Sequence, residues 1–244
     1  MADRQSLEEA LRRIWGYDHF RYPQGEVIDC LLAGRDCLVV LPTGGGKSIC
    51  FQLPALLGEG LTLVVSPLVA LMEDQVQSLR RQNLPAACLH SQLSRPERKH
   101  VLYQLGQQQL KLLYLSPETL LSEPVWNLLR QPQVKLQGIM LDEAHCLVQW
   151  GDSFRPAYRR LGALRRGLGR DKDEIPLAAF TATADRQQQD LIIAGLNLRS
   201  PECFQVSPHR PQLHLKVKTV LSEYCRRQQR RRLLLKLLQE TGLV

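Results

Sequence analysis

Short apolar runs alternate with longer amphipathic stretches along most of this chain. Runs of four or five apolar residues are typical of buried strands, and between them apolar side chains recur at helical spacing. This alternation predicts an α/β fold, a mostly parallel sheet flanked by helices on both faces. Strands are expected at Cys37–Leu41, Leu61–Val65, Ala86–Leu89, Lys111–Leu115, Gly138–Leu141 and Leu177–Phe180. Helices are expected at Ser6–Ile14, Lys47–Leu57, Leu68–Gln82, Arg95–Leu105, Tyr158–Gly167 and Asp185–Gly195.

Polar or turn-forming residues follow most of these strands directly. Because ligands of such sheets sit beyond the carboxyl ends of the strands, we expect these segments to share one working face. The segments are the glycine-rich loop 41–48, Ser66-Pro67, Ser116-Pro117, Asp142-Glu143 and Thr181-Ala-Thr183.

The loop Leu41-Pro-Thr-Gly-Gly-Gly-Lys-Ser48 lies between an expected strand and an expected helix, which is the setting of a phosphate-binding loop. Its glycines allow backbone N–H groups to turn toward anionic oxygens at a helix N-terminus. Lys47 can reach the β- and γ-phosphates, and the Ser48 hydroxyl can ligate Mg²⁺. Leu41 stands where the general pattern has glycine, and the variant Thr-Gly-x-Gly-Lys-Ser is the form found in helicases. The predicted nucleotide-binding residues here are Thr43, Gly44, Gly45, Gly46, Lys47 and Ser48.

A second acidic motif, Asp142-Glu143, ends the apolar run that begins at Gly138. Asp142 can hold Mg²⁺ opposite Ser48, and Glu143 can orient or deprotonate an attacking water. Alone, such a pair could equally be an exposed turn. Because a phosphate loop lies about 95 residues upstream, on a strand expected to be adjacent, the pair favours nucleotide hydrolysis.

Composition sets broader limits on the 244-residue chain. Its formal charge of +8 favours an anionic partner such as nucleic acid, and 44% hydrophobic residues suffice for an ordinary core. The seven cysteines form no C-x-x-C pair, so we expect reduced thiols and no zinc site. The polar N-terminus and the lack of an apolar run near ~20 residues predict no signal peptide, no membrane partner and a cytoplasmic location, nucleoid-associated if bacterial.

Seven segments in order resemble the first RecA-like motor lobe of RecQ-type DNA helicases, which belong to the class with DEAH-type second motifs. The resemblance runs from Ile14 to about Leu213. It implies a RecA-like P-loop NTPase lobe over residues 1–206, followed by a crossing segment and basic helix at 207–244 that lead toward a second lobe. The segments are 15–24, 41–48, 65–76, 114–118, 142–145, 149–158 and 179–185.

For the nucleotide, the resemblance implies an adenine pocket and a γ-phosphate sensor. Tyr17 and Arg21 would sandwich the base, and Gln24 would hydrogen-bond its edge, giving a preference for ATP. From the residues alone, packing of Tyr17 and Phe20 before a helix, with Arg21 solvated, is an equal alternative. His145 would sense the γ-phosphate. The catalytic residues implied are Lys47, Asp142, Glu143 and His145.

For DNA, the segment 149–158 matches the aromatic-rich loop that couples single-stranded DNA to ATP turnover. Trp150 and Phe154 could stack on bases and Arg155 could approach the backbone. The alternative is a loop packed into a hydrophobic seam. Asp152-Ser153 departs from the usual His-Asp of the family, and a carboxylate near DNA should weaken coupling.

Two turns and two threonines complete the implied DNA path. Ser66-Pro67 and Ser116-Pro117 would grip the DNA backbone, although routine turn chemistry also explains them. Thr181 and Thr183 would link the ATP site to DNA. Beyond them, a run of arginines within 226–240 could touch phosphates but is more often a solvated helix face.

The resemblance implies an ATP- and Mg²⁺-dependent 3′→5′ DNA helicase of repair and recombination, acting on single-stranded or partly duplex DNA. Such a motor needs a second RecA-like lobe whose arginine finger completes the site, and no such motif is found in this sequence. Losing such an arginine typically costs ~10³–10⁵ in kcat. We therefore expect the chain, as the N-terminal portion of a longer motor, to bind ATP, hydrolyse it poorly and leave duplexes intact. The alternatives are a nucleotide- and single-stranded-DNA-binding module with little turnover, which could modulate a full-length partner, and an RNA-dependent DEAH-class ATPase.

Overall fold

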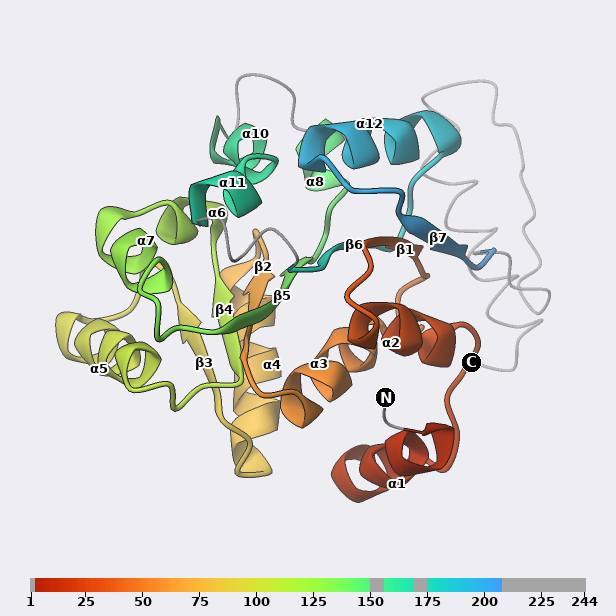
Figure 1. Ribbon diagram of the computed structural model, residues 1–244, viewed down its shortest axis with the longest axis horizontal. Coiled ribbons are helices and arrows are strands. Elements are labelled where there is room, and N and C mark those ends of the chain that lie inside the picture. The colour runs from red at the N-terminus through yellow and green to blue at the C-terminus, as the bar shows by residue number, and fades with distance from the viewer. Residues whose placement is uncertain (1–2, 150–155, 169–174, 208–244) are drawn as a thin grey trace, which may run out of the picture. The chain divides into compact units, whose positions relative to one another are not determined.

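The protein is built on a seven-stranded, wholly parallel sheet with strand order β3-β4-β2-β5-β6-β1-β7 (Figure 1). The computed structural model describes residues 3–149, 156–168 and 175–207. The fold class predicted from the alternating pattern is therefore confirmed. The strands are β1 (Cys37–Val40), β2 (Leu61–Val65), β3 (Ala86–Leu89), β4 (Leu112–Leu115), β5 (Leu136–Leu141), β6 (Leu177–Thr181) and β7 (Glu202–Gln205).

Helices cover both faces of the sheet, because nearly every strand residue is buried and both sides need an apolar partner. Val39 of β1 packs with α2, α3 and α4, whereas Leu38 and Val40 pack with the helices of the opposite face. The first group is α2 (Gln24–Leu32), α3 (Lys47–Leu57) and α4 (Val69–Arg81). The second is α5 (Arg95–Gly106), α6 (Pro117–Leu120), α7 (Glu123–Leu129), α8 (Cys146–Gln149), α10 (Pro156–Leu161), α11 (Leu164–Leu168) and α12 (Arg186–Leu196).

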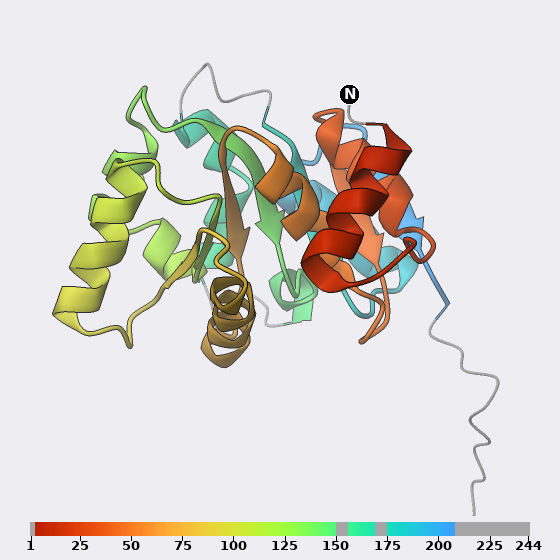
Figure 2. The ribbon, with the colours of Figure 1, turned by 90° about the horizontal axis from the view of Figure 1, so that it is seen from below.

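The first helix, α1 (Arg4–Trp15), forms an outer layer on α2 and α3 (Figure 2). Leu7 and Ala10 of α1 form a small separate core with Ile28 of α2 and Leu53 of α3. Asp3 caps the helix, since its side chain accepts a hydrogen bond from Ser6 N. Thus α1 is docked by its own apolar contacts, away from the sheet.

Strand order corrects one expectation. The phosphate-loop strand β1 and the Asp-Glu strand β5 are not neighbours, because β6 lies between them and pairs with both. Sequence distance carries no information on this non-local pairing. The carboxyl ends of the three strands still lie at the same edge of the sheet.

Other differences lie in short or edge elements. The last strand expected ended at Phe180, but a further strand, β7, pairs in parallel with β1 as the edge strand. The helix expected at 158–167 is two helices, α10 and α11, separated near Gly162. A Cβ on Gly162 would lie 2.3 Å from Gly195 O of α12, so this break permits close packing. The helices α6, α7 and α8 were not expected, and for α2, the helix that follows Tyr17 and Phe20, no bounds were predicted.

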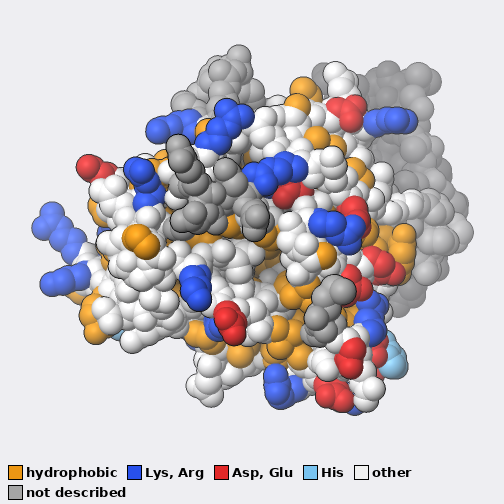
Figure 3. All heavy atoms as spheres, in the orientation of Figure 1, with side chains coloured by type: hydrophobic (Ala, Val, Ile, Leu, Met, Phe, Trp, Pro, Cys, Tyr) orange, Lys and Arg blue, Asp and Glu red, His pale blue; other side chains and the backbone are white. Residues whose placement is uncertain are grey.

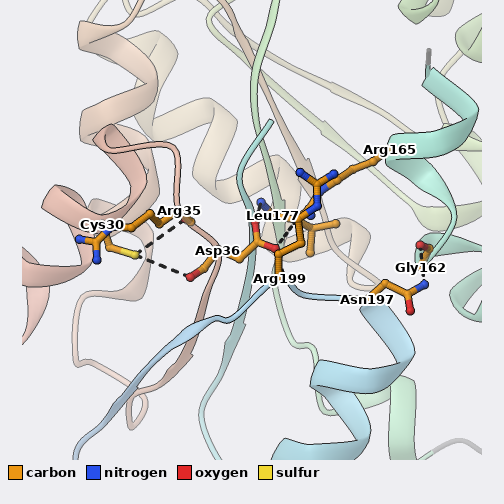
Figure 4. Close-up of polar contacts among 8 residues, drawn as sticks. All are labelled: Cys30, Arg35, Asp36, Gly162, Arg165, Leu177, Asn197 and Arg199. Atoms are coloured by element: carbon orange, nitrogen blue, oxygen red, sulfur yellow. Dashed lines mark hydrogen bonds and ion pairs between the residues drawn. The ribbon is translucent and has the colours of Figure 1, made fainter. Parts of the chain in front are cut away.

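At the amino ends of the strands, Asp36 joins four parts of the fold (Figure 4). This aspartate is 5% exposed, and Oδ1 accepts a hydrogen bond from Leu177 N of β6 at 2.9 Å. Oδ2 accepts from Arg199 N, just before β7, at 2.6 Å, and from Arg165 Nη2 of α11 at 2.5 Å. The buried charge is therefore paired and hydrogen-bonded within the protein.

Two further features bear on the expectations from composition. Among the described residues, no cysteine is joined to another in a disulfide bond. None of the helices in that part of the chain is long and apolar enough to cross a lipid bilayer. The expected crossing segment and basic helix lie, from residue 208 onward, outside the described residues.

Candidate functional site

The loop between β1 and α3 owes its shape to consecutive glycines. Gly44 and Gly46 adopt left-handed φ angles of 80° and 77°, which glycine tolerates best. A Cβ on Gly45 would lie 2.9 Å from Pro42 O, too close for any side chain. No side chain caps α3, and its N-cap is Gly46. The exposed loop therefore leads into an uncapped helix N-terminus, which is suited to bind an anion.

Lys47 is the first residue of α3 and folds back across this loop. Its Nζ donates a hydrogen bond to Leu41 O at 3.1 Å, and the side chain is half-buried. Ser48, next in the first turn, is also half-buried. Both side chains thus stand where phosphates at the loop would be bound.

Asp142 and Glu143 follow β5 and are brought close to Lys47. Asp142 is 4% exposed, and burial, together with the nearby Glu143 carboxylate, raises its pKa to about 6, while Lys47 acts in the opposite direction. Glu143 adopts a left-handed φ of 53°, which is uncommon for a side chain of this kind. This bend lets Glu143 N donate to Asp142 Oδ1 at 3.0 Å while its carboxylate turns elsewhere.

That carboxylate lies against His145, which connects β5 to β6. His145 Nδ1 is 3.2 Å from Glu143 Oε2 and 3.0 Å from Thr181 Oγ1. The Thr181 hydroxyl donates to Thr183 O at 3.0 Å, so it accepts from His145 and the Nδ1 proton is assigned to the imidazole. Glu143, His145, Thr181 and Thr183 therefore form a continuous polar chain across two strands.

The segment before α2 approaches the loop from the other side. Arg21 Nη1 donates to Gly44 O at 3.5 Å, and its Cζ lies 6.0 Å from the centre of the Tyr17 ring, which is half-exposed. Gln24 is 4% exposed, and Oε1 accepts from Arg21 N at 2.9 Å. Its Nε2 donates toward Gly45 O and Gly46 O at 3.3 Å each. The amide expected at an adenine edge thus ties this segment to the phosphate loop.

A groove of about 670 Å³ opens beyond the ends of β2, β3 and β4. Its lining includes Pro67 and Ser116 from the two predicted turns, with Arg98 at its side. Ser116 also caps α6, because its Oγ accepts from Thr119 N at 3.2 Å. Routine turn chemistry is therefore part of its role, and its place in the groove is compatible with a second one.

Sequence reasoning missed the residues that follow β3. His90, Ser91 and Gln92 line the same groove. His90 is 1% exposed, with Nε2 3.1 Å from Glu73 Oε1, and within the described residues Nδ1 has no hydrogen-bond partner. The signal was present, since β3 was predicted and its following residues had to reach the same edge.

Some of the remaining predicted residues lie outside the described part of the chain, and others lie within it. Trp150, Phe154, Arg155 and the departure at Asp152-Ser153 lie outside the described residues. Among those that are described, His, Cys, Asp and Glu side chains form no cluster of three that could hold a metal ion. The roles given to the site residues stay predictions.

The sequence profile of DEAD/DEAH box helicases matches residues 21–191. The chain therefore belongs to the DEAD/DEAH box helicase family. This match covers the phosphate loop, the acidic motif and the polar chain to β6.

Within that family the similarity is to RecQ-type members. The chain is 95% identical, over its whole length, to the ATP-dependent DNA helicase RecQ of Synechocystis sp., of which it covers 51%. It is 42% identical over 210 residues to the ATP-dependent DNA helicase RecQ of Pasteurella multocida, a match that covers 86% of this chain and 32% of that protein. The chain thus spans about half of one relative and about a third of the other. These findings confirm the RecQ-type resemblance.

Solved structures agree on the fold. The crystal structure of DUF1998 helicase MrfA matches 85% of this chain and 33% of that chain, with a TM-score of 0.64 at 19% identity. A hypothetical ATP-dependent RNA helicase from Sulfolobus tokodaii matches 83% of this chain and 57% of that one, with a TM-score of 0.59 at 17% identity. At such identities the likeness concerns the fold alone, and it confirms a RecA-like lobe.

Proposed function

We propose that this chain is the ATP-binding motor lobe of a RecQ-type 3′→5′ DNA helicase that serves DNA repair and recombination. The observation that carries the proposal is the meeting, at one sheet edge, of the phosphate loop with Asp142 and the polar chain from Glu143 to Thr183. The names of the RecQ relatives support DNA as the polymer that is unwound.

The loop and Lys47 bind the triphosphate in this proposal. Lys47 Nζ donates to a neutral acceptor, Leu41 O, and this contact can be exchanged for phosphate oxygens. Tyr17 and Arg21 stack loosely on one another at 6.0 Å and offer an aromatic face and a guanidinium plane to a purine. Gln24 holds this segment on the loop through hydrogen bonds from its Nε2 to Gly45 O and Gly46 O. On nucleotide binding it would exchange only some of its hydrogen bonds for contacts with the base.

Ser48 and Asp142 would hold Mg²⁺, and their oxygen atoms suit this hard cation. The raised pKa of Asp142 fits the assignment, because burial and Glu143 leave a carboxylate that a cation would stabilise. When bound, the ion neutralises charge on the transferring phosphoryl group.

Glu143 orients the attacking water, and its own position is fixed by His145. Because His145 Nδ1 donates to Thr181 Oγ1 and lies 3.2 Å from Glu143 Oε2, a shift of β6 or of Thr183 changes the placement of the Glu143 carboxylate. This chain of contacts gives a physical route by which polymer binding can alter nucleotide turnover.

Single-stranded DNA would lie in the groove beside Pro67 and Ser116. The buried Ser66 Oγ has no hydrogen-bond partner within the described residues, and the same holds for His90 Nδ1 at the end of the neighbouring β3–β4 pair. Arg98 adds positive charge at the groove wall. The hydroxyl groups and the arginine of this surface suit the phosphate backbone, which a translocating motor contacts without reading sequence, whereas Glu118 in the same lining adds one negative charge.

The test is ATP binding by calorimetry and steady-state ATP hydrolysis, with single-stranded DNA, with RNA and without polymer. Lys47→Ala should abolish binding, whereas substitution of an exposed lysine just before β5, Lys135→Ala, should leave it intact. DNA-stimulated turnover lost in Lys47→Ala supports a motor lobe. Binding without turnover supports a nucleotide-binding module, and stronger stimulation by RNA supports the RNA-dependent alternative. Binding that survives Lys47→Ala would refute the nucleotide site.

A further inference from the structure

One face of α1 carries a regular polar stripe that no part of the nucleotide site explains. Arg4, Glu8 and Arg12 are spaced four residues apart, so they lie on the same side of the helix. Acidic, basic and histidine side chains intermingle over this helix at the surface (Figure 3). We call these three residues the α1 stripe.

Each member of the α1 stripe contacts one residue of the segment that follows the helix. Arg12 Nε donates to Asp18 Oδ1 at 2.7 Å, and Glu8 Oε1 lies 3.4 Å from His19 Nδ1. Arg4 stacks on Phe20, with Cζ 5.0 Å from the ring centre. The contacts run in reverse order along the two pieces of chain. The segment 18–20 is therefore laid antiparallel along the helix.

Arg4 also joins this segment to α2. Its Nη1 donates to Asp29 Oδ2 at 3.3 Å, and its guanidinium covers Gly25, where a Cβ would lie 1.9 Å from Nη2. Gly25 directly follows Gln24, which is bonded to the phosphate loop. One arginine therefore contacts both ends of the turn that leads into α2.

Besides the α1 stripe, two contacts support the segment: Phe20 packs against the small core under α1, and Arg21 N donates to Gln24 Oε1. Residues 16–21 form neither helix nor strand, and Gly16, which ends α1, adopts a left-handed φ of 74°. Tyr17 and Arg21, at either side of Asp18–Phe20, are both exposed. The conformation that places these two side chains face to face thus depends on contacts such as those of the α1 stripe.

We propose that the α1 stripe is a positioning device for base recognition. It holds Asp18–Phe20 so that Tyr17 and Arg21 stay face to face, in the arrangement from which they would part to admit a purine ring. The inference rests on the proposed nucleotide site and adds residues that touch neither base nor phosphate. Because Leu7 and Ala10 dock α1 through a different face, the stripe can be removed while the helix stays in place.

The test compares Arg4→Ala/Glu8→Ala/Arg12→Ala with a matched triple variant one position further along, Gln5→Ala/Glu9→Ala/Arg13→Ala, whose side chains are exposed. Binding of ADP and of inorganic tripolyphosphate is measured by calorimetry. Tripolyphosphate engages the loop without a base. The stripe variant should bind ADP about three- to tenfold more weakly, the modest size expected because its ion pairs are largely exposed. Its tripolyphosphate affinity, and both affinities of the matched variant, should equal those of the parent chain.

Equal ADP affinity in the two triple variants would overturn the proposal, and so would a parallel loss of ADP and tripolyphosphate, which would indicate a general disturbance of the loop. Arg4→Lys in place of Arg4→Ala should restore the charge but not the stacking on Phe20, and hence only part of the ADP affinity. Failure of the proposed function has a different signature, since the parent chain would then bind neither ligand in a Lys47-dependent way.

Discussion

Two buried aspartates, one at the amino ends of the strands and one at the carboxyl ends, differ in the hydrogen-bond donors and charges that the protein places around them. Asp36, before β1, and Asp142, after β5, are 5% and 4% exposed. Asp36 receives an arginine and two backbone N–H groups from distant parts of the chain. Asp142 receives Glu143 N and faces a second carboxylate, and no lysine or arginine forms an ion pair with it in the described part of the chain.

This difference separates a structural carboxylate from a binding one. At the amino ends of the strands the protein supplies all the positive charge that Asp36 requires. At the carboxyl ends, burial and the Glu143 carboxylate destabilise the ionised form of Asp142. A bound cation would remove this cost. The two sites can therefore be told apart by what each substitution does to stability.

The largest expected effect is on the Asp36 side. Arg165→Met should leave a buried charge without its counter-ion and lower the free energy of unfolding by about 3–5 kcal/mol. The neighbouring Arg166→Met, at an exposed position of α11, is the control and should change stability little. Chemical denaturation measures both. Equal, small effects would mean that Asp36 needs no arginine and would remove the contrast.

Asp142→Asn should instead raise the free energy of unfolding. The folded-state pKa of about 6 exceeds the ordinary 3.8, so the folded protein binds the proton more tightly and loses stability as the pH rises from about 4 to 7. In metal-free buffer the variant should lack this loss and exceed the parent chain at pH 7 by on the order of 1–3 kcal/mol. Asp36→Asn should instead destabilise. A variant less stable than the parent at pH 7 would show that Asp142 is a structural residue.

The smallest effect concerns the polar chain to β6. Thr181→Val removes the acceptor of His145 and the donor to Thr183 O, and should cost about 1 kcal/mol of stability. Its larger signature should be a loss of DNA-stimulated, but not basal, ATP turnover. Thr181→Ser keeps the hydroxyl and should retain stimulation. If DNA stimulates ATP turnover equally in both variants, the polar chain from Glu143 to Thr183 does not couple DNA binding to turnover.

The elements were more predictable than their arrangement. Short apolar runs in the sequence predict the buried strands, and the bounds of β2 and β3 agree with those expected. Strand order escaped prediction, because the insertion of β6 between β1 and β5 depends on non-local pairing. β7 was missed because its residues alternate between partial burial and exposure at a sheet edge, which weakens the apolar signal.

For the site, the sequence predicted which residues form each motif but not which distant residues they contact. The glycines and Lys47 define the phosphate loop from sequence alone, since each position has a distinct physical requirement. That His145 meets Thr181, 36 residues away, or that Gln24 is held by the loop it was expected to assist, depends on tertiary contacts. Nothing local distinguishes Asp36 from an ordinary surface aspartate, although it proves to be a buried junction.

The most direct test of the contrast between the two aspartates is the Mg²⁺ dependence of ADP binding, measured by calorimetry on the parent chain and on Asp142→Asn. If Asp142 is left for a cation, Mg²⁺ should strengthen ADP binding to the parent chain, and the variant should lose most of that gain while keeping its metal-free affinity. An equal gain in both proteins would contradict the account and make Asp142 a buried residue without a part in binding.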